Sequence, residues 1–135
     1  MKTLTKEMQN KITPAQALDL LKSGNKRFIG NLSMNRNLLQ QVNETSDGQH
    51  PFAVVISCMD SRTSAELIFD QGLGDIFSIR IAGNVINEDI LGSAEFACKV
   101  VKSKLIIVLG HTSCGAVKGA IDDVDLGHLH FITKK

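Results

Sequence analysis

Five residues of this 135-residue chain could share one chemical task. Cys58, Asp60 and Arg62 alternate along V-V-I-S-C-M-D-S-R at the end of an apolar run. His111 and Cys114 follow a second apolar run, in H-T-S-C-G. Two thiolates and one imidazole are the softer donors that suit zinc, and a catalytic zinc keeps three protein ligands and one open position. The pattern predicts a zinc site made by the two cysteines and the histidine.

Asp60 and Arg62 indicate what such a metal would be used for. Zinc makes a bound water more acidic, but thiolate ligands donate charge and weaken this effect. Asp60 could accept a hydrogen bond from that water and orient a lone pair toward an electrophile, while Arg62 keeps the carboxylate ionised. Asp60 is also close enough to Cys58 in sequence to swing onto the metal. The sequence therefore predicts two states for Asp60: paired with Arg62 in the active form and bound to the metal in the inactive form.

Strands and helices alternate at short intervals around these residues. Continuous apolar runs predict buried parallel strands at residues 52–57, 76–81 and 105–109. Helices are expected at residues 14–29, 64–71, 89–102 and 115–121, with a short one near Leu38 in the polar connection 30–50. This alternation predicts an α/β fold with a parallel-core sheet flanked by helices. Ligands of such sheets bind beyond the carboxyl ends of the strands, where Cys58 and His111 fall.

Residues 1–30 are expected to form an N-terminal helical arm. Thr13 suits the N-cap position of a helix, and Pro14 suits its first turn. A stripe at helical spacing follows, formed by Ala17, Leu18, Leu21, Asn25 and Phe28. This stripe needs a surface to cover, either the sheet of its own subunit or a neighbouring subunit.

Length and composition limit the classes of function. A chain of 135 residues, 43% hydrophobic and 21% charged, suits one globular domain, residues 1–135. A net charge of +1 gives no electrostatic argument for nucleic acid or an anionic membrane as partner. We expect a cytoplasmic protein, because no secretory signal or transmembrane run is visible. Three cysteines in such a chain favour metal or catalytic roles over disulfides.

The motifs C-M-D-S-R, R-I-A-G-N and H-T-S-C-G-A, in that order after a helical arm, resemble the β-class carbonic anhydrase family over residues 13–123. The resemblance implies that Cys58, His111 and Cys114 bind one zinc per chain and that Asp60 and Arg62 form a catalytic dyad. It also implies that Gln49 hydrogen-bonds the substrate, as in one subtype of the family.

The same resemblance implies a reaction and an assembly. The reaction is the hydration of carbon dioxide, held in a small apolar pocket, to bicarbonate and a proton. The family uses its N-terminal helices to embrace a second subunit, so a homodimer or an assembly of dimers is expected. Family members normally continue well past the H-x-x-C motif, whereas this chain ends at Lys135. We expect a C-terminally shortened chain that keeps its metal ligands.

Two other functions stay open. One is a zinc hydrolase of carbon disulfide or carbonyl sulfide, since β-class relatives can use the same site on those molecules. The other is a catalytically silent zinc-binding or assembly module, lacking the C-terminal part of the family.

Several residues have simpler interpretations as well. Gln49 could be an ordinary loop residue, and Cys98, among apolar helix residues, is expected to be a packed thiol. His128 and His130 are expected to be solvated. The turn Ala82–Asn84 could bring backbone near the site, or could simply need small residues.

Overall fold

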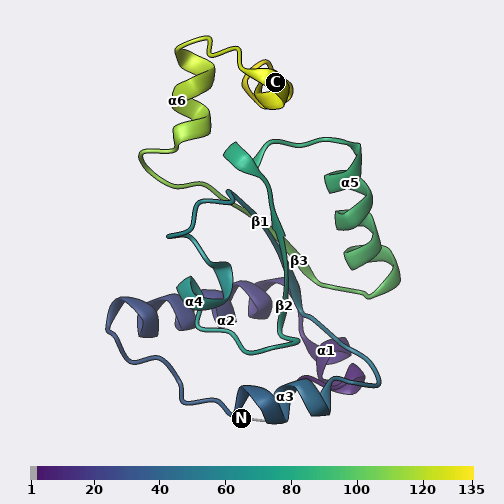
Figure 1. Ribbon diagram of the computed structural model, residues 1–135. Coiled ribbons are helices and arrows are strands. Elements are labelled where there is room, and N and C mark those ends of the chain that lie inside the picture. The colour runs from purple at the N-terminus through teal and green to yellow at the C-terminus, as the bar shows by residue number, and fades with distance from the viewer. Residues whose placement is uncertain (1–2) are drawn as a thin grey trace.

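The computed structural model describes residues 3–135, which form a three-stranded sheet with helices on both faces (Figure 1). The strands are β1 (Ala53–Ser57), β2 (Ile76–Arg80) and β3 (Leu105–Leu109). The helices are α1 (Lys6–Lys11), α2 (Pro14–Ile29), α3 (Leu38–Glu44), α4 (Ala65–Ile68), α5 (Glu88–Glu95), α6 (Gly115–Ile121) and α7 (His130–Thr133). Short 3-10 turns, η1 (Ala82–Asn84) and η3 (Gly127–Leu129), and a π-helical segment, η2 (Phe96–Val100), complete the chain.

All strands of the sheet are parallel, in the order β2-β1-β3. The last residue of β1, Ser57, lies beside Arg80 of β2 and Leu109 of β3, so the three strands end together. Central strand β1 is buried along its whole length. The predicted α/β class with a parallel-core sheet is confirmed, and the segments that follow β1 and β3 leave from the same edge.

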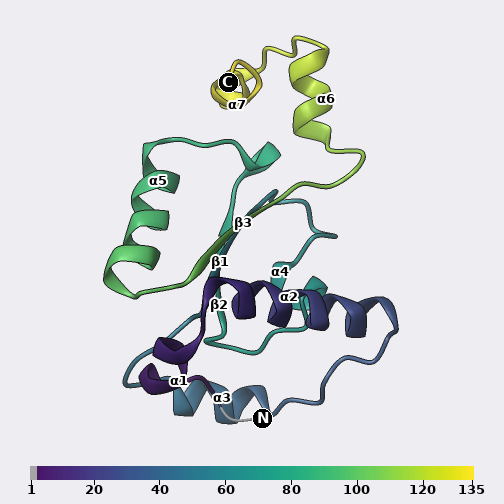
Figure 2. The same cartoon turned by 180° about the vertical axis from the view of Figure 1, so that it is seen from behind.

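Each face of the sheet has its own apolar cluster. The helices that cover the two faces lie on opposite sides of the sheet (Figure 2). Val55 packs with Ala17 and Leu21 of α2, and α4 adds Ala65 on the same face. On the other face, Val54 and Ile56 pack against α5. β3 adds alternate residues to the first cluster but leaves Ile106 and Val108 exposed on the second face. The second face is therefore only partly covered within the described residues.

Helix α2 begins as the sequence predicts. The Thr13 hydroxyl accepts a hydrogen bond from the Gln16 amide, and the Gln16 side chain accepts one from the Thr13 amide, which completes a capping box. The buried side of α2 includes Gly24, where a Cβ would lie 1.6 Å from the Phe69 carbonyl oxygen. Phe28, the last residue of the predicted stripe, is 44% exposed.

Two helices are shorter than predicted. The helix expected at 64–71 spans only Ala65–Ile68, and the chain turns at Asp70, whose φ is +46°. The helix expected at 89–102 ends at Glu95 and continues as the π-helical segment to Val100. There the Val101 amide donates to the Phe96 carbonyl, one residue further back than in an α-helix.

Helix α1 lies within the predicted helical arm of residues 1–30, for which only the helix from Pro14 was expected with bounds of its own. Its buried Gln9 donates to the carbonyls of Pro51 and Val101, at 2.8 and 3.0 Å, which fixes α1 below the amino ends of the strands. At the opposite end of the sheet, α6 and α7 lie beyond the carboxyl ends of the strands (Figure 1). No helix within residues 3–135 has the length and apolarity that crossing a bilayer requires.

Candidate metal centre

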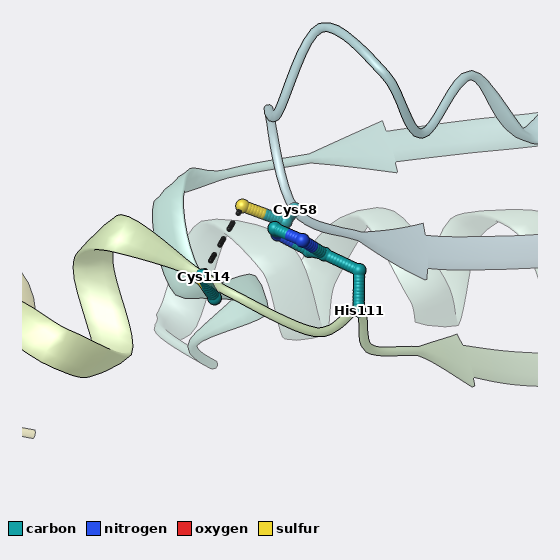
Figure 3. Close-up of side chains that lie close together, drawn as sticks. All are labelled: Cys58, His111 and Cys114. Carbon is teal, nitrogen blue, oxygen red and sulfur yellow. Dashed lines mark hydrogen bonds between the residues drawn. The ribbon is translucent and has the colours of Figure 1, made fainter.

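The carboxyl ends of β1 and β3 bring three soft donors together (Figure 3). Cys58 follows β1 directly, and His111 and Cys114 lie in the segment between β3 and α6. One ligand atom from each residue lies within 4.8 Å of the other two. The matched register of the strands explains this meeting, because Ser57 and Leu109 are paired and each segment leaves the sheet at the same level.

The spacing of the two sulfurs fits a shared metal ion. Cys58 Sγ and Cys114 Sγ are 3.9 Å apart, and both cysteines are free thiols. Two sulfurs that each lie about 2.3 Å from one tetrahedral ion are about 3.8 Å apart. A disulfide would need an S–S distance of about 2.0 Å. The pair is therefore arranged as two ligands of one ion and not as a disulfide.

His111 presents one ring nitrogen to this space. Its Nδ1 donates to the Thr112 carbonyl at 2.8 Å, because a carbonyl can only accept, and this fixes the proton on Nδ1. Nε2 is buried and has no hydrogen-bond partner of normal geometry among the described residues. The Cys58 sulfur contributes most to raising the pKa of His111, and the Asp60 carboxylate adds to the effect. A buried, unpaired lone pair beside two sulfurs is what a metal ligand offers.

The Cys58 thiol is prepared for ionisation. Burial opposes the charged form, but the neighbouring His111 ring, the Asp60 and Gly83 amides and the Cys114 side chain together lower its pKa to about 7. The Gly83 amide lies 3.3 Å from the sulfur. Since the thiolate is the form that binds metal, these donors favour the ligand state of Cys58.

Asp60 and Arg62 form a bidentate ion pair at the rim of this cluster. Arg62 donates through Nε to Oδ1 at 2.9 Å and through Nη2 to Oδ2 at 2.8 Å, and the Arg62 amide also donates to Oδ1. These hydrogen bonds hold the pKa of Asp60 well below its usual range. Asp60 Oδ2 lies 4.0 Å from His111 Nε2, so the carboxylate borders the donor set while paired with Arg62.

Gln49 lies at the other end of the sheet. It is exposed and precedes β1, whereas Cys58 follows β1. The strand alone separates its two ends by about 13 Å at roughly 3.3 Å per residue. Within residues 3–135, Gln49 forms no hydrogen bond with the five residues of the site. Its role in substrate binding stays a prediction, and one subunit by itself does not bring Gln49 to Cys58.

The sequence model of a known family, described as Carbonic anhydrase, matches residues 53–135. The chain belongs to the carbonic anhydrase family. The matched region contains all three metal donors and the Asp60–Arg62 pair, and it begins at the first residue of β1.

Curated relatives support the same family assignment. The chain is 45% identical over 117 residues to a carbonic anhydrase of Mycolicibacterium smegmatis, covering 86% of this chain and 57% of the relative. It is 46% identical over 119 residues to carbonic anhydrase 2 of Mycobacterium tuberculosis, covering 86% of this chain and 56% of the relative. The chain thus spans about half the length of the curated relatives it matches.

Solved carbonic anhydrases place the chain in the β class. The β-carbonic anhydrase CafA of Aspergillus fumigatus is 30% identical, with a TM-score of 0.65 over 87% of this chain and 57% of that one. The β-carbonic anhydrase CcaA is 38% identical, with a TM-score of 0.57 over 78% of this chain and 53% of that one. The predicted β-class resemblance is confirmed.

Two contacts to the site were not predicted from the sequence. The Arg80 side chain reaches the backbone of the Cys58–Asp60 segment, and the Gly83 amide reaches the Cys58 sulfur. Their signal in the sequence is the R-I-A-G-N motif, whose end could form a turn that brings backbone near the site. Their effect depends on strand pairing, which places the end of β2 beside the end of β1.

Proposed function

We propose that this chain catalyses the reversible hydration of carbon dioxide to bicarbonate and a proton, as a zinc-dependent lyase. The observation that carries the proposal is the cluster of Cys58, His111 and Cys114, with a charged Asp60 at its rim. Two thiolates and an imidazole suit zinc better than they suit magnesium, calcium or manganese, which prefer oxygen ligands. Membership of the carbonic anhydrase family supplies the reaction.

The three donors would hold one zinc per chain, and the ion would supply Lewis-acid activation of a water molecule. The Thr112 carbonyl keeps the proton of His111 on Nδ1, so that Nε2 faces the cluster as a donor. Asp60 remains ionised because Arg62 lowers its pKa, and an ionised carboxylate can only accept hydrogen bonds. Asp60 would therefore accept a hydrogen bond from a neighbouring water and leave an oxygen lone pair directed at carbon dioxide.

The state seen here has Asp60 turned to Arg62, with both carboxylate oxygens engaged. This matches the arrangement predicted for the active form. The alternative, in which Asp60 binds the metal and closes the open position, stays a prediction.

The proposal includes a homodimer or an assembly of dimers. Leu20 and Phe28 of α2 are each 44% exposed, and an apolar helix surface of this kind suits burial against a second copy. A structurally similar β-carbonic anhydrase of Sordaria macrospora, 28% identical with a TM-score of 0.64, is one of two described as tetrameric. A second copy would also offer a way for Gln49 to approach a site that its own subunit keeps distant. The expected cytoplasmic location stays a prediction.

Zinc content, molecular mass in solution and stopped-flow carbon dioxide hydration test the proposal together. We expect one zinc per chain and measurable hydration. Cys114→Ala should lose the metal and the activity, whereas Cys98→Ala, which removes a thiol from the π-helical segment outside the cluster, should keep both. Full zinc occupancy in Cys114→Ala would contradict its role as a ligand. One zinc per chain without hydration would instead favour the silent zinc-binding module.

A further inference from the structure

The end of β2 holds the segment that carries Cys58 and Asp60. Arg80, the last residue of β2, donates through Nε to the Cys58 carbonyl at 3.2 Å and through Nη2 to the Asp60 carbonyl at 2.5 Å. The intervening Met59 amide donates to the Ile81 carbonyl. Three successive residues of the metal-binding segment are therefore hydrogen-bonded to the end of β2 and the residue after it: two to the Arg80 side chain and one to the Ile81 backbone.

The guanidinium of Arg80 suits this task. Its donors are fixed in one plane, so two of them can set the distance between two carbonyls in a way that a flexible ammonium group cannot. Among the ion pairs of residues 3–135, none involves Arg80, so its side chain serves the segment and no carboxylate. The contact therefore fixes where Cys58 and Asp60 lie relative to each other.

Gly83 adds a direct contact to a ligand atom. Its amide donates to Cys58 Sγ at 3.3 Å, and its backbone has a φ of +66°, in the left-handed region that favours glycine. A Cβ at Gly83 would also lie 3.2 Å from the Cβ of Ala116 in α6, which begins directly after Cys114. The small residue thus lets η1 lie between the segment carrying one thiol and the helix that follows the other.

We propose that Arg80 and Gly83 are positioning residues of the metal centre. Arg80 fixes the backbone of the Cys58–Asp60 segment, and the Gly83 amide directs and stabilises the Cys58 sulfur as a ligand. Together they hold the donor set in its binding geometry before metal arrives, which increases metal affinity. This inference rests on the proposed zinc site and deepens it, because neither residue touches the metal or the substrate.

Zinc affinity, measured by competition with a chromophoric chelator, tests the role of Arg80. Outer-shell partners typically contribute about 10- to 100-fold to metal affinity, and we expect a loss of this size in Arg80→Ala. Arg80→Lys should recover part of the loss, since an ammonium group can still donate to one carbonyl. Ser78→Ala is the matched control: Ser78 lies on the same strand and donates to Glu66, away from the segment. It should bind zinc as the parent does.

Cobalt(II) substitution gives a readout that overall stability does not affect. The thiolate-to-cobalt absorption reports the geometry of the sulfur ligands, and we expect it to change in Arg80→Ala and Gly83→Ala while Ser78→Ala keeps the parent spectrum. Thermal unfolding in the presence of a chelator identifies any variant that simply fails to fold. If Arg80→Ala does fail, partial recovery by Arg80→Lys of both affinity and spectrum carries the test.

The outcomes separate this inference from the proposed function. If the parent binds neither zinc nor cobalt, the proposed metal centre is wrong. If the parent binds both and folded Arg80→Ala matches it in affinity and spectrum, the metal centre stands and the positioning role of Arg80 is overturned. An unchanged spectrum in folded Gly83→Ala would show that the turn only requires a small residue.

Discussion

Asp60 and Asp70 lie ten residues apart, and both pair with arginine, yet their surroundings differ. Asp60 is at the edge of the sheet, with its side chain 18% exposed, and its partner Arg62 is 68% exposed. Asp70 is 2% exposed and lies between two arginines, Arg27 of α2 and Arg36 of the connection to α3. The Met34 amide also donates to the Asp70 carboxylate.

Both aspartates have lowered pKa values, but the causes differ. At Asp60 the hydrogen bonds from Arg62 dominate. At Asp70 burial opposes ionisation, and Arg27 and Arg36 together outweigh it. The Asp60–Arg62 pair therefore keeps a charge accessible beside the candidate metal centre. The buried Asp70 charge instead joins α2, a loop and the turn after α4. A low pKa alone does not distinguish catalysis from structure; the accessibility of the carboxylate does.

The largest expected effect is on the activity of Asp60→Asn. The amide keeps the size of the side chain but cannot act as a charged, acceptor-only group, so we expect carbon dioxide hydration to fall about 100-fold or more. Zinc content and the urea midpoint of unfolding should stay at the parent values, because Asp60 is not among the metal donors and its pair is exposed. Hydration at the parent rate would show that the dyad assignment is wrong.

Asp70→Asn should show the opposite pattern. The substitution leaves two arginine side chains around a neutral group, and breaking a buried ion pair in this way costs about 3–5 kcal/mol of unfolding free energy. Urea unfolding at neutral pH measures this loss. Zinc content per folded chain should stay the same, because within residues 3–135 the hydrogen bonds of the Asp70 carboxylate are with Arg27, Arg36 and Met34 and with none of the three donors. A parent-like unfolding free energy would contradict the structural role of Asp70.

Acid should remove the difference between the parent and Asp70→Asn. Because the folded-state pKa of Asp70 is lowered, its carboxylate contributes stability above the ordinary aspartate pKa of about 3.9. That contribution disappears as the pH falls through the lower pKa of the folded state. Urea unfolding across this range should show the two free energies converging. Asp60→Asn is the control and should follow the parent throughout, since exposed ion pairs contribute little.

The candidate site could be predicted from the sequence, whereas several contacts that stabilise the fold could not. Strand β3 was predicted at its observed bounds, and the apolar run before Cys58 predicted β1 to within one residue. Both strands are continuous apolar runs, and parallel pairing brings their ends together. The meeting of Cys58 with His111 could therefore be predicted from local patterns and one topological rule.

The contacts of Asp70, Arg80 and Gln9 could not be predicted in the same way. Asp70 pairs with residues 34 and 43 positions earlier in the chain, and nothing in the local D-Q-G sequence indicates a buried charge. Gln9 is a polar residue in a polar segment, yet it is buried, where it donates to the backbone carbonyls of Pro51 and Val101. These interactions depend on which segments become neighbours after folding, which hydrophobic periodicity does not specify.

The smallest expected effect is on the hydration rate of Arg62→Lys, which changes the arginine partner of Asp60. Arg62→Lys keeps the positive charge but loses the planar two-point contact with Asp60, so the carboxylate is held less firmly. We expect hydration to fall about tenfold, at the low end of what outer-shell partners contribute, with no measurable change in the urea midpoint. Arg36→Lys is the matched control: its side chain is 7% exposed, so it should lower the midpoint and leave the hydration rate per folded chain unchanged. If both variants lost hydration rate and urea midpoint alike, the assignment of Asp60–Arg62 to catalysis and of the buried Asp70 pairs to stability would be wrong.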